Sequence, residues 1–408
     1  MIEQLFPRDW GYFAMSAHGD VICDFADWIV RRGYSRICSR VYVRHLRKVL
    51  AVNDVERDAM GRIRLSTVDG WFLPLSHDSI YCATRRAVVR YLMARSLLVS
   101  DAASGPLEAV VGEYRTFLLT VRGLSATTTG QHARTVKALI DFACPDPQRL
   151  ARLRQQDIEA FVERSGTVMS RPSLQHEIAH LRSFLRFCAD RGYTKSKLDV
   201  IDMPRVYRGE LPPRALDWPM VCKLLDSIDT SAPEGLRDHA ILYLMAHFGL
   251  RPSEVAALTV DAIDWTAGKV RVEQRKTRSS IILPLDEQAR RVIRRYLDAR
   301  RPDSPWKEIF LKVRCPPDPI KAATIDDIFS KRLRLSGLSV TASGPYSLRH
   351  SFAMRLLQKG VGIKTIGDLL GHRSLESTCV YLRLHVEALR EVGLPVPHAP
   401  HKSQRAAS

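Results

Sequence analysis

The sequence contains cysteines but lacks the patterns that would make them metal ligands or a disulfide framework. Its eight cysteines are scattered, without a C-x-x-C pair and without a Cys/His cluster at zinc spacing. Dispersed cysteines of this kind are typical of reduced cytosolic thiols. We therefore expect no metal site, and we expect most of the cysteines to lie in the core.

Long apolar runs and a signal peptide are also missing. The longest apolar stretch, around residues 240–250, is interrupted by His247 and Gly249 and does not approach bilayer length. The N-terminal MIEQLFPRDWGYF carries acids early and has no signal-peptide core. These absences predict a cytoplasmic protein with no membrane partner. The sequence also lacks the Gly-x4-Gly-Lys-Ser/Thr loop that would bind ATP, so we expect no cofactor.

What the chain has in excess is positive charge. Its 408 residues include 62 Lys and Arg against 44 Asp and Glu, which gives a net charge of +18 and a pI of about 9.8. The surplus is spread along the chain, which favours a large polyanionic partner such as nucleic acid. A merely basic enzyme is the alternative on charge alone. Hydrophobic residues make up 45 % of the chain, enough for packed cores.

Composition and periodicity divide the chain into blocks. Residues 1–100 begin with a helical pattern over 21–52 and form an N-terminal helical extension. After a linker at 101–106, residues 107–205 have helical periodicity throughout. A Pro- and Arg-rich linker leads to a mixed block at 212–395, and residues 396–408 form a basic tail that we expect to be disordered.

The two helical blocks share a weak sequence similarity at a fixed offset, here called the sequence echo. Arg32-Gly33-Tyr34-Ser35 and Arg122-Gly123-Leu124-Ser125 lie ninety positions apart, and the same offset matches Arg44 with Arg134 and Arg47 with Lys137. Two helical modules that each lay a basic face on a duplex would produce this echo. Chance repetition of a helix-turn-helix pattern would produce it as well, and the sequence leaves both explanations open.

The mixed block has two predicted strands among helices. A buried helix over 239–250 closes at Gly249, and a second helix over 251–265 has Pro252 in its first turn. Alternating residues at 269–274 and 280–285 predict a hairpin. Further helices are predicted at 324–337, 347–360, 362–372 and 375–389.

Four short motifs in this block carry residues suited to phosphate chemistry. Arg251 stands at a turn beside a helix N-terminus, where free N–H groups favour anions. Lys276 lies at the hairpin tip and is able to supply a proton. Arg349 with His350 forms the third motif, and His372 with Tyr381 forms the fourth. Each motif alone has an ordinary explanation, as an ion pair, a solvated tip, a helix cap or a core aromatic.

Together, in this order and spacing, the motifs resemble the tyrosine recombinase (phage integrase) family over residues 216–390. FGLRPSEVAALTVDAIDW is similar to its first arginine box, RKTRSSIILPL to its lysine hairpin, YSLRHSFAMRLL to its second arginine box, and LLGHRSLESTCVYLRL to its His-to-Tyr box. The resemblance implies a mainly α fold with a small β component. It comprises a helical SAM-like core-binding domain at 107–205 and an α+β catalytic domain. Residues 1–100 have no clear counterpart and would be an additional DNA-binding module.

The resemblance also implies a reaction. Tyr381 would attack a DNA phosphodiester and form a 3′-phosphotyrosyl bond without metal or ATP. Arg251 and Arg349 would bind the phosphate oxygens, Lys276 would protonate the leaving 5′-oxygen and His372 would donate a hydrogen bond. His350 would position these residues without reacting itself. No Asp/Glu cluster accompanies these residues, and Glu254 and Asp264 read as partners of the basic residues or as surface charges.

One position departs from the family pattern. Tyr346 stands where the family usually has a His, three residues before the second arginine. A phenol still donates one hydrogen bond but is too weak an acid to exchange protons readily at neutral pH. Either Tyr346 keeps the hydrogen-bonding role in an active enzyme, which we favour, or the site has decayed.

The leading hypothesis is therefore a site-specific recombinase or integrase of a mobile element. It would act on double-stranded DNA as a homo-tetramer on paired sites, alone or with sibling recombinases. The alternatives are a non-catalytic DNA-binding accessory of a partner recombinase and a type IB topoisomerase-like enzyme that nicks and reseals.

Overall fold

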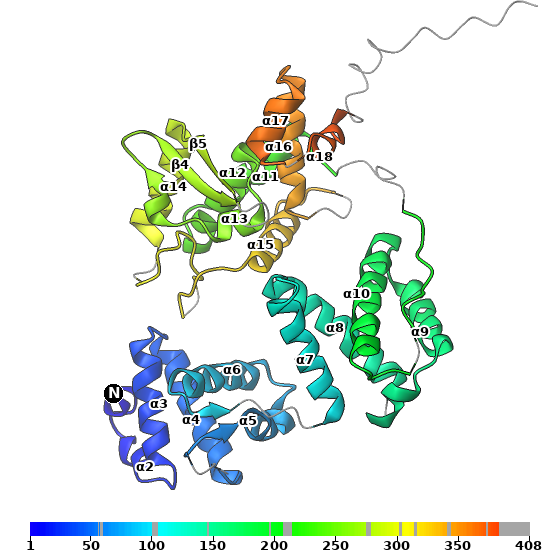
Figure 1. Cartoon of the computed structure of the whole chain (residues 1–408). Helices are drawn as coiled ribbons and strands as arrows, with labels where there is room; N and C mark the ends of the chain where they lie inside the picture. Colours follow the sequence, from blue (N-terminus) through cyan, green and yellow to red (C-terminus); the bar gives the residue numbers. More distant parts are fainter. Residues whose placement is uncertain are drawn as a thin grey trace, which may run out of the picture. The chain divides into compact units, whose positions relative to one another are not determined.

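The computed structural model describes residues 1–55, 57, 60–99, 105–144, 147–195, 197–206, 214–274, 279–301, 304–313, 316–340, 344–372 and 374–382. These residues are mainly helical and include two small sheets (Figure 1), which confirms the predicted fold class. The chain divides into two compact units, one of Met1–Ile29 with Ile37–Glu210 and one of Val30–Arg36 with Leu211–Ser408. The finer division into domains stays a prediction, and the tail at 396–408 lies outside the described residues.

Residues 1–99, here called the first module, are built from short and medium helices. The single helical pattern of the sequence is divided at Gly33, whose φ of 78° is accessible to glycine without strain. Strands β1 and β2 pair in parallel, with Ile63 opposite Leu98. The elements are α1 (Ile2–Leu5), α2 (Trp10–Ala14), α3 (Gly19–Arg31), α4 (Arg36–Val52), β1 (Ile63–Arg64), α5 (Leu65–Phe72), η1 (Leu73–Leu75), α6 (Ser79–Ala94) and β2 (Leu98–Val99).

Residues 105–206, here called the second module, are helical as predicted. Ser125 and Ser170 cap α8 and α10 by accepting backbone N–H groups from Thr128 and Ser173. Tyr114 and the inward faces of these helices form a separate apolar core. The elements are α7 (Pro106–Thr120), α8 (Ala126–Ala143), η2 (Pro147–Arg152), α9 (Gln155–Val168) and α10 (Arg171–Asp190).

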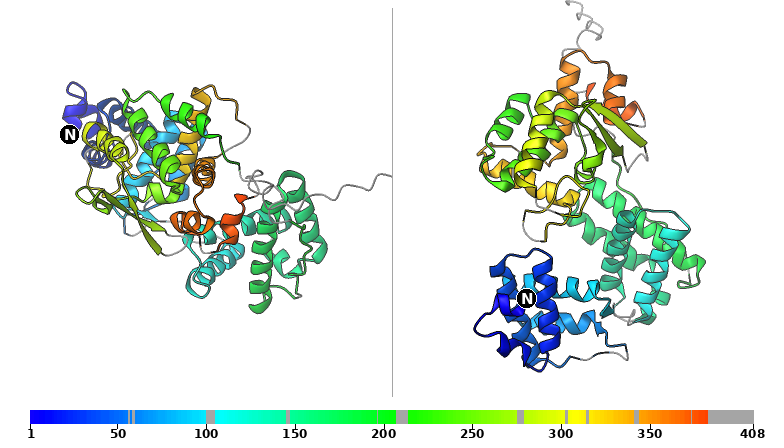
Figure 2. Two further views of the ribbon diagram at one scale, coloured as in Figure 1. Left: turned by 90° about the horizontal axis from the view of Figure 1, so that it is seen from above. Right: turned by 90° about the vertical axis from the view of Figure 1, so that its left-hand side faces the viewer.

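The described residues from 214 to 382 form the C-terminal unit around helix α12. This helix is buried along most of its length and contacts α11, α13, α14, α15 and α16 (Figures 1 and 2). An antiparallel sheet of β3, β4 and β5 packs beside α13, with Val270 opposite Leu283. The remaining elements, with their bounds, are α11 (Trp218–Asp226), α12 (Pro233–Phe248), α13 (Pro252–Ala256), η3 (Val260–Ala262), β3 (Ile263–Asp264), β4 (Lys269–Gln274), β5 (Ser279–Pro284), α14 (Glu287–Arg300), α15 (Ala322–Leu335), α16 (Tyr346–Gln358), α17 (Ile363–Leu370) and α18 (Glu376–Cys379).

The predicted hairpin and the closure of α12 at Gly249 are confirmed, but three sequence predictions are wrong. Of the helix predicted over 375–389, the described residues form only α18, which ends at Cys379. The helix predicted over 251–265 ends at Ala256, because Val260 donates its N–H to the distant Lys307 carbonyl and the chain turns into β3. The cysteines are not mostly core: of the seven described, only Cys144 and Cys188 are buried. Among the described residues, no helix is long and apolar enough to cross a bilayer.

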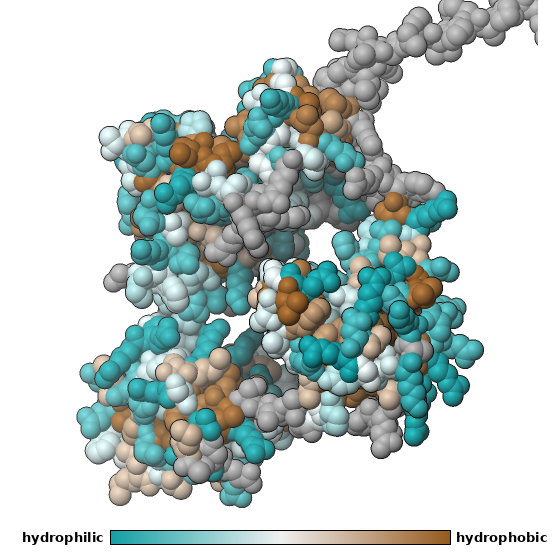
Figure 3. Space-filling model, viewed as in Figure 1, coloured by the Kyte–Doolittle hydropathy of each residue, from teal (hydrophilic) through white to brown (hydrophobic). Residues whose placement is uncertain are grey.

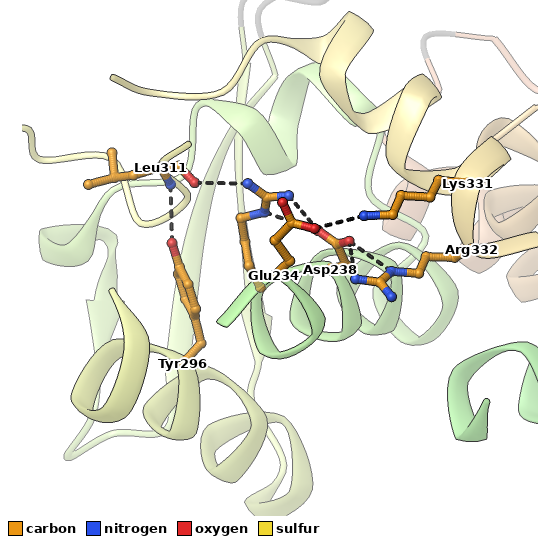
Figure 4. A network of polar contacts seen from close by, with 7 residues as sticks. Glu234, Asp238, Tyr296, Leu311, Lys331 and Arg332 are labelled. Carbon is orange, nitrogen blue, oxygen red and sulfur yellow. Dashed lines mark hydrogen bonds and ion pairs between the residues drawn. The ribbon is translucent and has the colours of Figure 1, made fainter. Parts of the chain in front are cut away.

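A buried ionic network ties α12 to α15 (Figure 4). Arg237 holds one oxygen of Asp238 at 2.7 Å, and Arg332 holds the other at 2.6 Å. Lys331 pairs with Glu234 at 2.7 Å beside this cluster. Both carboxylate oxygens of Asp238 therefore have a guanidinium partner within the fold, and each of the two arginines is paired directly with the carboxylate.

The visible surface is mostly hydrophilic (Figure 3), and its apolar patches are separated. One patch lies in the area of α16 and α17, where partly buried apolar side chains pack around the small cluster of Ala353, Ile366, Leu370 and Tyr381. This cluster supports the residues described next.

Candidate active site

Arg251 is positioned by the junction between α12 and α13. Gly249 ends α12 in the left-handed region, Pro252 opens α13, and Arg251 is the N-cap residue. Its backbone N–H and its guanidinium Nη1 donate to the two carboxylate oxygens of Glu254, at 2.8 Å and 2.5 Å. Glu254 is itself buried, so this pair fixes the arginine at the start of the helix.

Arg349, from α16, lies almost completely inside the unit, with 4 % of its surface exposed. It donates to the carbonyl oxygens of Gly249 and Leu370 at 2.6 Å and 2.5 Å. The nearest Glu254 oxygen is 3.9 Å away. Burial, followed by repulsion from Arg251, lowers the pKa of Arg349 to about 10. The guanidinium stays charged at neutral pH, but its charge is incompletely compensated.

Gly249 makes this approach possible. A Cβ at position 249 would lie 2.5 Å from Phe352 Cδ1 and 2.8 Å from Leu370 Cδ2, and its φ of 63° also favours glycine. The end of α12 can therefore come close enough to α16 and α17 for its carbonyl to reach Arg349.

Tyr381 follows α18 and is 2 % exposed. Its hydroxyl is 3.0 Å from Nδ1 of His350. Burial raises the pKa of Tyr381, whereas Arg349 and Arg251 act in the opposite direction. Burial and the neighbouring Arg349 lower the pKa of His350, so the imidazole is neutral at pH 7 and able to accept a proton at one nitrogen. The phenol therefore has a hydrogen-bond partner and two nearby cations.

His372 lies just after α17, which ends at Gly371 in the left-handed region. Burial, followed by Arg349, Arg251 and His350, lowers the pKa of His372 to about 4. The ring is therefore neutral at pH 7 and carries one N–H. Its Nδ1 is 2.8 Å from Oγ1 of Thr378, a fully buried side chain. When the threonine hydroxyl donates to Nδ1, the ring N–H lies on Nε2 and is available to a phosphate oxygen.

The end of β4 reaches the same place. A Cβ at Gly371 would lie 1.9 Å from Oε1 of Gln274, the last residue of β4, so the strand end packs directly against the turn that carries His372. Lys276 and the rest of the hairpin tip, 275–278, lie outside the described residues. The catalytic assignment of Lys276 stays a prediction.

Tyr346 opens α16 and is 49 % exposed. It is close enough to Arg349 to act on that arginine's pKa, raising it as Tyr381 does. Asp264, in contrast, is exposed and accepts the backbone N–H groups of Thr266 and Ala267 in a turn. It is therefore a turn cap, and only Glu254 of the two acids is a partner of the predicted site residues.

The structure thus brings together five residues that the sequence singled out, from α13, α16 and the segments after α17 and α18. They are Arg251, Arg349, His350, His372 and Tyr381. Sequence reasoning missed Thr378 and Gln274, whose contacts depend on the fold; the small residues Gly367 and Gly371 that pack against them were the available signal.

The arrangement is chemically a cationic site beside a phenol. Two guanidiniums share one carboxylate, which leaves a net positive charge that an anion such as a phosphate diester would balance. Among the described residues, no group of three or more His, Cys, Asp or Glu side chains is arranged to hold a metal ion. The site therefore places hydrogen-bond donors of positive charge beside a phenol hydroxyl.

Two sequence profiles match the chain. The Phage integrase family profile matches residues 216–388, and the profile of the phage integrase N-terminal SAM-like domain matches residues 111–192. The first covers all the described site residues. The second covers most of the second module.

Individual proteins match over longer stretches. A Sinorhizobium fredii protein that carries the name integrase/recombinase y4rA is 30 % identical over 392 residues, covering 92 % of this chain and 94 % of its own. Tyrosine recombinase XerD of Listeria monocytogenes is 29 % identical over 290 residues, 69 % of this chain and 95 % of its own. Among solved structures, a lambda integrase tetramer bound to a Holliday junction shares the fold, with a TM-score of 0.52 and 21 % identity over 66 % of this chain and 74 % of that one.

Proposed function

Because the chain belongs to the phage integrase family and is a tyrosine recombinase, a DNA strand transferase, we propose that Tyr381 is its nucleophile. The enzyme breaks and rejoins duplex DNA at specific sites through a 3′-phosphotyrosyl intermediate. One observation carries the proposal: the Tyr381 hydroxyl lies beside the buried Arg349 and the partly buried Arg251, which have a single carboxylate between them.

In the first step, the Tyr381 oxygen forms a bond to phosphorus while the bond from phosphorus to the 5′-oxygen breaks. The phenol proton passes to a base, and Nδ1 of His350, 3.0 Å from the hydroxyl, is within hydrogen-bond reach to accept it. The departing 5′-oxygen takes a proton from Lys276. Attack by a 5′-hydroxyl on the phosphotyrosine reverses these changes, so the bond energy is conserved and ATP is unnecessary.

The developing negative charge falls on the non-bridging phosphate oxygens. Arg251 and Arg349 donate N–H groups to them, and His372 donates from Nε2 while Thr378 holds Nδ1. Tyr346 donates a further hydrogen bond in place of the family's usual His. Its half-exposed side chain is accessible to a substrate in this role.

For partners, we propose double-stranded DNA and a homo-tetramer on paired sites, assembled alone or with sibling recombinases. The shared fold with the lambda integrase tetramer on a Holliday junction supports this analogy. A DNA substrate also supports action in the cytoplasm, and the recombinase names of the relatives support an origin in a mobile element.

The test is covalent capture on nicked suicide duplexes made from the DNA that flanks the protein's own gene. We expect a protein–DNA adduct that is resistant to denaturation and absent from Tyr381→Phe. Tyr243→Phe is the matched control, because the buried Tyr243 hydroxyl of α12 has no hydrogen-bond partner among the described residues and its removal should leave the adduct intact.

The alternatives give different results in the same assay. Tight DNA binding without any adduct would identify a non-catalytic accessory of a partner recombinase. An adduct that only reseals its own duplex, without joining a second duplex, would identify nicking and resealing of the type IB topoisomerase kind.

A further inference from the structure

The first and second modules have the same succession of helices. In each, a helix ends, the chain turns through a left-handed glycine, Gly33 or Gly123, and a longer helix follows: α3 and α4 in one, α7 and α8 in the other. A shorter helix, α5 or α9, and a final long helix, α6 or α10, complete both modules. The register of ninety residues seen in the sequence echo holds from Gly33 and Gly123 to the starts of α5 and α9. Between α6 and α10 the offset becomes ninety-six residues, as from Thr84 to His180.

The buried positions correspond in the same register. Ile63 of β1 and Val68 and Trp71 of α5 are buried, and so are the residues ninety positions later. Those later residues are Leu153, Ile158 and Phe161, in the same place relative to α9. Chance similarity of two amphipathic helices would fix a periodicity, but it would not fix the start of each helix as well.

The ends of the modules are closed by the same contacts. Arg95, after α6, pairs with Asp24 of α3, and Arg191, after α10, pairs with Glu113 of α7 at 3.1 Å. A left-handed residue follows each arginine, Ser96 with φ 56° and Gly192 with φ 75°. The next backbone N–H returns to the helix in both cases, from Leu97 to Leu92 and from Tyr193 to Cys188, at 2.8 Å each.

The second and last helices of each module are joined by one hydrogen bond with its partners exchanged. In the first module His45 of α4 meets Thr84 of α6, and in the second Thr135 of α8 meets His180 of α10. Both distances are 3.2 Å. The same two residue types thus join the corresponding helices in both modules, with the histidine and the threonine on opposite helices. This correspondence indicates a common architecture.

The first module differs from the second in its charge distribution. Helices α4 and α6 contain eight Lys and Arg residues and no Asp or Glu, whereas α3 contains Asp20, Asp24 and Asp27. Arg44 and Lys48 are exposed one turn apart on α4, as are Arg86 and Arg90 on α6. Arginines recur at the corresponding places of the second module, as Arg134, Arg182 and Arg186.

We propose that the first module is a second copy of the SAM-like module and that it binds the phosphate backbone of duplex DNA through α4 and α6. The proposal rests on the proposed function, because DNA is the polyanion on which a tyrosine recombinase works. Two modules of one design in a single chain enlarge the length of duplex that the enzyme holds. Exposed Lys and Arg at one-turn spacing suit phosphates, which bring affinity without base specificity.

The test compares the full-length protein with the variant Arg44→Gln/Lys48→Gln/Arg86→Gln/Arg90→Gln on a random-sequence linear duplex. If each residue contacts one phosphate, the slope of log affinity against log salt falls by about 3 to 4 units. The control variant Arg291→Gln/Arg294→Gln/Arg295→Gln/Lys307→Gln lowers the net charge equally in the C-terminal unit and leaves the slope near the parent value. Equal losses in both variants, or an unchanged slope in the first, would overturn the proposal.

Two further measurements separate this proposal from its premise and from misfolding. Covalent adduct formation on a short nicked substrate at low salt should persist in the four-residue variant. An adduct absent from the parent protein as well would overturn the proposed function itself. The charge-preserving variant Arg44→Lys/Arg86→Lys/Arg90→Lys should keep the parent slope; if it loses the slope too, the effect is not electrostatic. An unchanged DNA slope together with lost binding to an acidic protein would assign the surface to that other class of partner.

Discussion

The C-terminal unit contains two clusters made of the same parts, two arginines and one carboxylate, but the carboxylate is shared differently in each. In the first, Asp238 has a guanidinium on each oxygen, from Arg237 and Arg332. In the second, Glu254 is held closely by Arg251 but lies 3.9 Å from Arg349. Arg349 donates instead to two main-chain carbonyls.

This difference separates a structural ion cluster from one suited to a ligand. A carboxylate with both oxygens engaged leaves nothing for an incoming anion to replace. A buried arginine with a lowered pKa, next to a second arginine, is stabilised when an anion arrives. Residue type alone would have assigned both clusters the same role, whereas geometry distinguishes them.

The largest effect is expected from removing the charge of Asp238, whose two oxygens are both paired with arginines. Asp238→Asn leaves two buried guanidiniums without their shared counter-charge, so the free energy of unfolding of the C-terminal unit should fall by about 3–5 kcal/mol. Urea unfolding measures it. Asp264→Asn, which removes an exposed turn cap, is the control and should cost no more than about 2 kcal/mol. An Asp238→Asn protein as stable as the parent would contradict the comparison.

In the second cluster, the effect should be on rate rather than on stability. Arg349→Lys keeps the charge but loses the forked donor, so single-turnover cleavage should slow by about 10²–10³-fold, or 2.7–4 kcal/mol. DNA affinity should change little, because most of it comes from other phosphate contacts. Equal losses of binding and cleavage would remove Arg349 from the catalytic set.

A smaller effect on the cleavage rate tests the neutral His372, which lies near Arg251 and Arg349. Thr378→Val keeps the shape but removes the hydroxyl that meets His372, so the ring is no longer held in one tautomer. We expect cleavage to slow by about tenfold, or ~1.4 kcal/mol. Thr378→Ser should restore the rate, and equal rates for the two variants would show that the hydroxyl is unimportant.

The smallest single-residue effect is on the pH dependence of stability. The folded pKa of His372, about 4, lies below the unfolded value of 6.5, so the folded state binds fewer protons in this range. Its contribution to stability is present above pH 6.5 and is lost as the pH falls toward 4. His372→Gln should make the acid-induced loss shallower, and identical slopes would contradict the lowered pKa. The variant removes only part of the slope, because His247, with a pKa also near 4, contributes to it as well.

The candidate site was predictable to the extent that it depends on local motifs. Gly249 before Arg251 and the spacing of His372 and Tyr381 identified the residues, because turn chemistry and short intervals are visible in a sequence. Contacts between residues that are distant in the sequence could not be predicted, because they depend on the fold. Arg332 lies 94 positions from Asp238, and Gly249 lies 100 positions from Arg349.

The fold was predictable where one periodicity dominates. Strand β4 of the hairpin alternates strictly between exposed and buried residues, and α12 is closed by a glycine. The short α13 was not predictable, since its end depends on pairing between Val260 and Lys307. No local pattern in RPSEVAALTVDAIDW predicts that pairing.

The contrast in exposure between Tyr381, at 2 %, and Tyr346, at 49 %, has a practical consequence for chemical probing. A phenol-directed reagent added to the DNA-free protein will modify Tyr346 well before Tyr381. Peptide mapping of the two labels therefore gives the time course of labelling at each tyrosine. The moment at which the label reaches Tyr381 reports when its covering side chains move aside, without the need for a cleavable substrate.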